Sequence, residues 1–150
     1  MSEKILYVDA SDQILGRLAS IVAKKLLEGY RVVVVNAEKA VLSGEKNRII
    51  EGYKLLLKVK THYNPVKSGI RRPRSPVNIF RRAVRGMLPI DKPKGREAFK
   101  RLKVFVGVPE SLKGFEFIKF PEASVSKLAS KYVYVEEVSK AIGWKVRKNE

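Results

Sequence analysis

Four consecutive valines at residues 32–35, in the stretch VVVVNA, constrain the fold more than any other part of the sequence. A run without polar and apolar alternation is typical of a strand that is buried on both faces, and such strands belong mostly to parallel sheets. Parallel strands need long crossover connections, which are usually helices. The valines therefore predict an α/β fold in which helices cover a mostly parallel sheet.

The flanking segments supply the other parts of such a fold. Residues 4–10 (KILYVDA) and 102–107 (LKVFVG) have the composition of strands, and residues 13–29 have the wide apolar arc of a helix that packs on a sheet. The first strand, this helix and the valine strand fit within about thirty-five residues and form a predicted βαβ unit. A second helix is expected at about 44–58.

Helix boundaries are predicted from capping residues. Ser11 or Asp12 is expected to cap the first helix, and Gly29 stands where a glycine commonly ends a helix. Ser43 is the expected cap of the second helix. After residue 110 the pattern weakens: residues 115–125 fit a strand or an extended arm, and residues 134–145 indicate a short terminal helix.

The net charge of +17 is concentrated in one part of the chain. Residues 54–103 hold 16 Lys and Arg against two acids, so this third of the chain carries +14 while the remainder is close to balanced. Such a concentration opposes compact folding unless an anion compensates it. A polyanion is therefore a better predicted partner than an acidic protein or a membrane surface.

The basic region divides into a loop and a helix. Residues 61–76 are rich in Pro, Gly, Ser and basic residues and are predicted to form an extended loop. Ser75 as N-cap and Pro76 in the first turn then start a helix that runs to about residue 88. Its apolar side chains share one arc, and its three arginines lie together on the opposite side with Asn78.

Enzymatic function is not supported by the sequence. There is no cysteine, which excludes disulfides and cysteine nucleophiles and fits a reducing interior. His62 is the only histidine, and no carboxylate accompanies it as an orienting partner. Neither phosphate-binding glycine motif follows a predicted strand. No apolar stretch resembles a secretion signal or a membrane span, so a cytoplasmic location is expected.

The arginine clusters instead suit nucleic acid. A guanidinium group presents a planar fork to phosphate oxygens and also stacks on bases. No helix-turn-helix, zinc-finger or basic-zipper pattern is present. Folded RNA offers irregular grooves that suit a rigid core with a basic loop, but composition alone favours RNA over DNA only slightly.

Five segments, read in order, resemble the universal large-subunit ribosomal protein L-thirteen family. They are VDASDQILGRLAS, VVVVNAEKAVLSGEK, THYNP, FRRAVRGMLP and LKVFVGVP, and the resemblance covers about residues 5–109. The stretch HYNPVKSGIRRPRSP resembles the archaeal and eukaryotic branch, and the short C-terminal part is more similar to archaeal members. The resemblance implies a three-layer α/β/α sandwich with a four-stranded, mostly parallel sheet.

The same resemblance implies a structural role in the large ribosomal subunit, bound to its RNA and to neighbouring ribosomal proteins, without catalysis, cofactor or metal. It places the loop around His62, Tyr63 and Asn64 in the RNA-facing region. We therefore expect one domain over residues 1–150, with a basic loop and helix at about 61–88 and a C-terminal extension from about 110. The alternative is a free-standing nucleic-acid-binding regulator or RNA chaperone.

The residues expected to contact RNA share positive charge, a flat ring or a place in the basic loop. They are Lys58, Lys60, His62, Tyr63, Asn64, Lys67, Arg71, Arg72, Arg74, Arg81, Arg82, Arg85, Lys92, Lys94 and Arg96.

Overall fold

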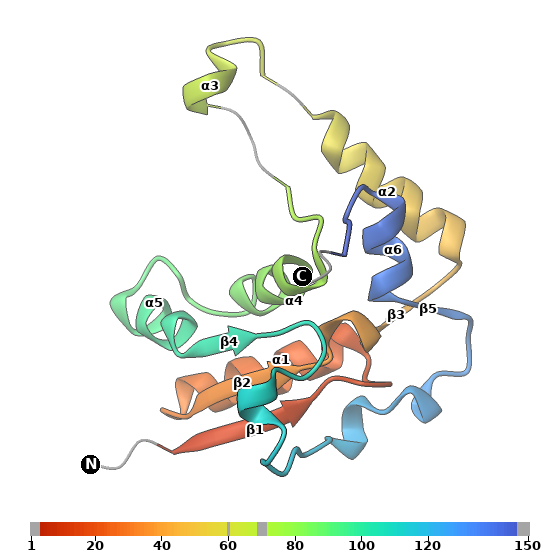
Figure 1. The fold of residues 1–150 in the computed structure, drawn as a ribbon. Coiled ribbons are helices and arrows are strands. Elements are labelled where there is room, and N and C mark those ends of the chain that lie inside the picture. The colour runs from red at the N-terminus through yellow and green to blue at the C-terminus, as the bar shows by residue number, and fades with distance from the viewer. Residues whose placement is uncertain (1–3, 60, 69–71, 147–150) are drawn as a thin grey trace.

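A parallel sheet forms the centre of the molecule (Figure 1). The structure is a computed structural model and describes residues 4–59, 61–68 and 72–146. Strands β1 (Ile5–Asp9), β2 (Arg31–Val35) and β4 (Leu102–Val104) pair in parallel in the order β1-β2-β4. A second, antiparallel sheet joins β3 (Val41–Ser43) to β5 (Tyr132–Tyr134). The predicted α/β class with a parallel sheet is confirmed.

Helices and short 3-10 turns connect these strands. The helices are α1 (Leu15–Leu27), α2 (Lys46–Lys58), α3 (Pro65–Ser68), α4 (Pro76–Arg85), α5 (Pro93–Lys100) and α6 (Val135–Ala141). The 3-10 turns are η1 (Ala37–Lys39), η2 (Glu110–Leu112), η3 (Pro121–Ala123) and η4 (Val125–Lys127).

The valine strand lies in the middle of the sheet, as its composition predicts. β2 has a parallel neighbour on each side, and Val34 pairs with Val8 of β1 and Val104 of β4. All four valines are buried, with Val34 and Val35 fully excluded from solvent. A strand in this position presents both faces to other elements, which explains why its sequence does not alternate.

One face of the sheet is covered by helices. α1 packs on β2, and α4 and α5 contact both α1 and β4, so the three helices form one layer (Figure 1). Gly29 has the left-handed φ of +100° expected of a residue that ends a helix. The predicted cap at the helix start is wrong. Ile14 is the N-cap, and Asp12 accepts a hydrogen bond from Tyr134 Oη at 2.9 Å instead.

The opposite face of the sheet is covered by the irregular segment that follows β4. The Tyr7 ring stacks on Phe115 at 4.6 Å between ring centroids and meets the Phe117 ring edge-on at 6.1 Å. Ile118 forms a single parallel bridge with Val8 at the free edge of β1. The described residues therefore form a three-stranded parallel sheet with one isolated bridge at its edge. Among these residues, the layer on this second face consists of irregular chain and contains no long helix.

Helix α2 is attached to the body more loosely than α1. Its predicted range of about 44–58 is confirmed, but Ser43 does not cap it, because Ser43 belongs to β3 and pairs with Tyr132. No residue of α2 is fully buried: Tyr53 packs against the core, whereas Leu55 and Leu56 stay 65% and 44% exposed. The predicted terminal helix is confirmed as α6.

Asp9 connects three segments at the carboxyl end of the sheet. Its Oδ1 accepts hydrogen bonds from the Ser11 backbone N–H at 2.9 Å and from Asn36 Nδ2 at 3.1 Å. Lys119 Nζ lies 4.0 Å from Oδ2. Burial would raise the pKa of Asp9, but these hydrogen bonds and the lysine outweigh burial and hold the pKa below its usual value.

Asp9→Asn should therefore reduce the free energy of unfolding at pH 7 by about 1 kcal/mol, because charge-assisted hydrogen bonds are lost. Since the folded-state pKa of Asp9 is lowered, its stabilisation is present above the unfolded-state pKa and is lost as the pH falls through the folded-state value. Urea unfolding between pH 6 and pH 3 should show wild type and variant converging below about pH 4. A stability difference that stays constant over this range would contradict the assignment, and Asp91→Asn at an exposed site serves as control.

Candidate nucleic-acid interface

Helix α4 starts and packs as its sequence predicts. Ser75 Oγ accepts a hydrogen bond from the Asn78 backbone N–H at 3.3 Å, and Pro76 occupies the first turn. Ile79, Phe80 and Val84 are buried against the core, and Phe80 is fully excluded from solvent. The helix is therefore held firmly by one face, and its opposite face can carry charged side chains at fixed positions.

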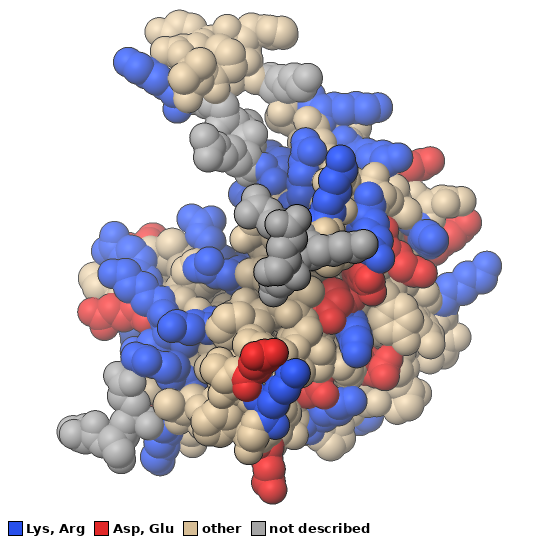
Figure 2. Space-filling model, in the orientation of Figure 1, with Lys and Arg blue, Asp and Glu red and all other residues tan. Residues whose placement is uncertain are grey.

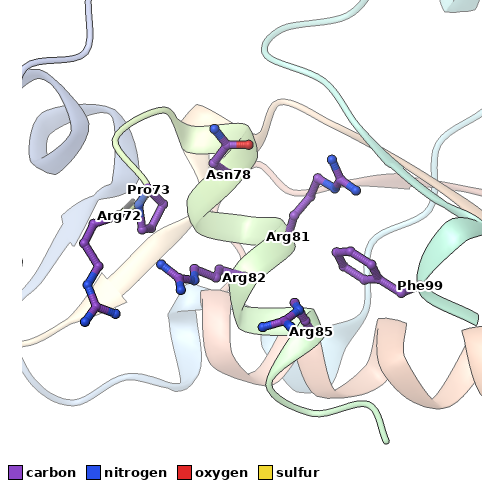
Figure 3. A pocket seen from close by; sticks show the side chains of 7 residues that line it. All are labelled: Arg72, Pro73, Asn78, Arg81, Arg82, Arg85 and Phe99. Atoms are coloured by element: carbon purple, nitrogen blue, oxygen red, sulfur yellow. The ribbon is translucent and has the colours of Figure 1, made fainter. Parts of the chain in front are cut away.

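The outer face of α4 forms one side of an open pocket of about 310 Å³. Arginines from two segments line it together with smaller and aromatic residues: Arg72, Pro73, Asn78, Arg81, Arg82, Arg85 and Phe99 (Figure 3). We call these seven residues the arginine pocket. None of them carries a negative charge, so the four guanidinium groups give the pocket a strongly positive character.

The arginines point to different sides of α4. Arg81 reaches over Phe99 of α5, with its guanidinium carbon 4.9 Å from the ring centroid, whereas Arg82 reaches toward Arg72 (Figure 3). This cation–π contact holds the Arg81 guanidinium group against α5. The Nε atoms of Arg72 and Arg81 are buried and have no hydrogen-bond partner among the described residues.

Helix α5 extends the positive surface beside the pocket. Lys92, which immediately precedes α5, and Lys94 and Arg96 within it are exposed, and Figure 2 shows Lys and Arg side chains gathered around this part of the molecule. Arg101 has a structural role instead. Its Nη2 donates a hydrogen bond to the Leu26 carbonyl at 2.6 Å, and thereby satisfies the C-terminus of α1.

The predicted basic loop projects away from the sheet and the helices that cover it (Figure 1). Its tip contains the short helix α3, which the sequence did not predict. The loop residues expected to contact RNA are exposed: Lys58 at its base, then His62, Tyr63, Asn64 and Lys67. Tyr63 is 85% exposed, so its ring does not pack against the core. The loop tip and the arginine pocket are therefore two distinct places on the surface.

The remaining predicted residues have different positions. Lys60 and Arg71 lie outside the described residues. Arg74 is exposed and lies against the C-terminal segment, since a Cβ at Gly143 would stand 3.1 Å from Arg74 Nη1. The structure thus brings Arg72, Arg81, Arg82 and Arg85 together in one pocket and leaves the other described candidates around it or on the loop.

Phe99 is the main pocket residue absent from the residues predicted to contact RNA. Its ring faces Arg81 because α5 packs beside α4, a tertiary contact that neither helix encodes alone. The available signal was a lone aromatic residue within a strongly basic stretch, which is typical of nucleic-acid-binding surfaces. Pro73 and Asn78 were noted in the loop and on the helix, but not as parts of a pocket.

The chemistry of the site is that of anion recognition. Guanidinium groups bind phosphate oxygens, and the Arg81–Phe99 pair offers a flat surface to a base. Within residues 4–59, 61–68 and 72–146, no group of three or more His, Cys, Asp and Glu side chains is placed to hold a metal ion. No helix in the described part of the chain is long and apolar enough to cross a membrane.

Comparison with known proteins identifies related chains. The family model described as Ribosomal protein L13 matches residues 3–111. The large ribosomal subunit protein uL13 of Saccharolobus solfataricus is 57% identical over 144 residues, covering 96% of both chains. The uL13 of Aeropyrum pernix is 52% identical over 93% of this chain and 90% of its own. The uL13 of Methanocaldococcus jannaschii is 47% identical over 92% of this chain and 97% of its own.

Proposed function

The chain belongs to the ribosomal protein L13 family, and we propose that it is a structural constituent of the large ribosomal subunit that binds and stabilises ribosomal RNA. It is not an enzyme. Its archaeal relatives match nearly the whole chain, which confirms the predicted family and its archaeal branch. We place it in the cytoplasm, on the ribosome.

The observation that carries this function is the arginine pocket on a rigid helix. Four guanidinium groups without a lining carboxylate would repel one another in an isolated protein, and RNA phosphates neutralise such charge. The buried face of α4 keeps the guanidinium groups in place before RNA binds, so less conformational entropy is lost on binding than with a mobile basic tail. This arrangement suits a protein that holds a fixed RNA fold.

We propose that the predicted RNA contacts form two groups with different roles. The arginine pocket and the exposed cations of α5 grip the RNA against the body of the protein. The projecting loop, with Lys58, Tyr63 and Lys67, reaches farther and inserts between RNA segments. Irregular RNA folds expose single-stranded bases that aromatic side chains such as Tyr63 can stack against.

We also propose two finer features of the assembled protein. The isolated bridge between Val8 and Ile118 supports a fourth parallel strand at the edge of β1, and hence the four-stranded sheet of the predicted sandwich. The exposed Leu55 and Leu56 of α2 support contact with neighbouring ribosomal proteins, because adjacent exposed apolar side chains are typical of interfaces. Residues 1–150 then act as one domain.

Equilibrium binding over a series of salt concentrations tests this function. The purified protein should bind large-subunit ribosomal RNA more tightly than duplex DNA of equal length, and the preference should persist as salt rises. Each neutralised phosphate should add about 0.7 to 0.9 to the slope of log affinity against log salt. Equal affinities for both nucleic acids, lost together at raised salt, would contradict the proposal. Retention on large subunits through a high-salt wash distinguishes a constituent from a free regulator, which would dissociate.

A further inference from the structure

The arginine pocket contains more than a phosphate requires. Its volume of about 310 Å³ equals the room of about ten waters, which is more than a phosphate group alone fills. Beside its guanidinium groups it has two flat apolar surfaces, the ring of Pro73 and the ring of Phe99. In a site that bound only backbone phosphates, the Phe99 ring could serve only to position the Arg81 guanidinium group, whereas a base could also stack on these groups.

Resting on the proposed function, we propose that the arginine pocket holds one unpaired nucleotide of the RNA. The base stacks on the Arg81–Phe99 pair, and the sugar-phosphate faces the other guanidinium groups of the pocket. The guanidinium carbon of Arg81 lies 4.9 Å from the centroid of the Phe99 ring, so two flat groups are already together where a base would stack. Unpaired bases in RNA commonly stack on aromatic rings and guanidinium planes.

The donors that line the pocket fit the same ligand. Arg72 comes from the loop and Arg81 from α4, so guanidinium groups from two segments face the pocket. Each guanidinium group donates several N–H bonds, and a nucleotide offers acceptors both on its base edge and on its phosphate. A nucleotide therefore fits the pocket by its chemistry as well as by its size.

The ring and the charges can be tested separately. Phe99→Leu removes the aromatic surface without changing charge, and Phe99→Trp keeps an aromatic surface. Because stacking contributes about 1–3 kcal/mol per base, Phe99→Leu should weaken binding to large-subunit ribosomal RNA by roughly 5- to 150-fold, and Phe99→Trp should bind close to wild type. The salt slope should stay unchanged in both variants, since no phosphate contact is lost.

Phe115→Leu is the matched control, because Phe115 is a half-exposed aromatic residue on the opposite face of the sheet. It should bind RNA as wild type does. Thermal unfolding of each variant, measured without RNA, shows whether the fold is kept. Ultraviolet crosslinking of the protein–RNA complex gives a direct readout: a nucleotide adduct is expected at Phe99 or Arg81 and should be lost in Phe99→Leu.

The outcomes separate this inference from the proposed function. If the wild-type protein does not prefer ribosomal RNA to duplex DNA, the proposed function itself is overturned. Wild-type RNA binding together with an unchanged affinity of folded Phe99→Leu would overturn only the nucleotide pocket. A reduced salt slope in Phe99→Leu would also overturn it, because the ring would then act only by holding Arg81 against a phosphate. Crosslinks confined to the projecting loop would likewise overturn the nucleotide pocket and leave the proposed function standing.

Discussion

Replacing Arg81, Arg82 and Arg85 together with alanine is expected to weaken binding to large-subunit ribosomal RNA by on the order of 10³-fold at fixed salt. Hydrogen bonds to charged groups contribute about 1.5–3 kcal/mol each, and the triple variant loses at least one per arginine. The slope of log affinity against log salt should fall by about 1.4 to 1.8, because Arg82 and Arg85 each meet a phosphate while Arg81 stacks on a base. The free energy of unfolding should fall by only about 0.5–2 kcal/mol, because the Arg81–Phe99 contact is lost while the buried face of α4 is kept.

A matched control separates this effect from a loss of net charge. Lys24, Lys113 and Lys131 are exposed cations outside the arginine pocket, and their triple substitution by alanine removes the same charge. This control variant should lose far less affinity for RNA. If both triple variants weaken binding equally, the pocket has no special role and binding depends on overall charge. If the arginine variant unfolds, its three side chains support the fold instead.

Gly95→Ala should destabilise the protein by several kcal/mol, which makes it the largest expected effect on folding. Gly95 is buried in the first half of α5, and a Cβ at this position would overlap the backbone carbonyl of Pro89. A backbone group cannot move aside as a flexible side chain can, so α5 would have to shift as a whole. Urea unfolding measures the loss, and binding should weaken as well, because α5 carries Phe99.

Gly52→Ala is the natural control for this variant. Gly52 lies in the middle of α2, and nothing stands within 4 Å of an added Cβ. Alanine is favoured over glycine in a helix by about 0.5–1 kcal/mol, so Gly52→Ala should raise the free energy of unfolding. The two glycine substitutions should thus have opposite signs. If Gly95→Ala is as well tolerated as Gly52→Ala, then the packing of α5 against Pro89 is not as close as the structure shows.

The sequence predicted the parts of the fold that local patterns determine. The four valines indicated a central strand, and the capping pair at residues 75 and 76 gave the start of α4 correctly. Two capping predictions were wrong, because contacts with distant residues outweigh the local preference. Asp12 binds Tyr134, which is 122 residues away, and Ser43 pairs with Tyr132 in a strand that its own neighbourhood does not indicate. Local capping preferences cannot compete with such tertiary contacts.

In the candidate site, too, local patterns predicted some features, whereas features that depend on distant contacts were missed. The amphipathic pattern of α4 placed its three arginines away from the buried residues of the helix, and all three line the arginine pocket, although they point to different sides of the helix. The pattern could not show that Arg72 of the preceding loop faces the same pocket, or that Phe99 arrives from another helix. Arg101 belongs to the same basic stretch of residues 54–103, but it donates a hydrogen bond to the Leu26 carbonyl at the end of α1. Charge composition alone does not distinguish a cation that binds a ligand from one that satisfies a backbone group.

The pairing of β3 with β5 has a consequence for how the protein is made. Val133, Val135 and Ile142 are buried in the folded protein, so its core stays open at one end until residues 133–142 have been synthesised. The helix that carries the arginines emerges about fifty residues earlier. In a nascent chain, the arginines of α4 are therefore synthesised before the last residues of the hydrophobic core.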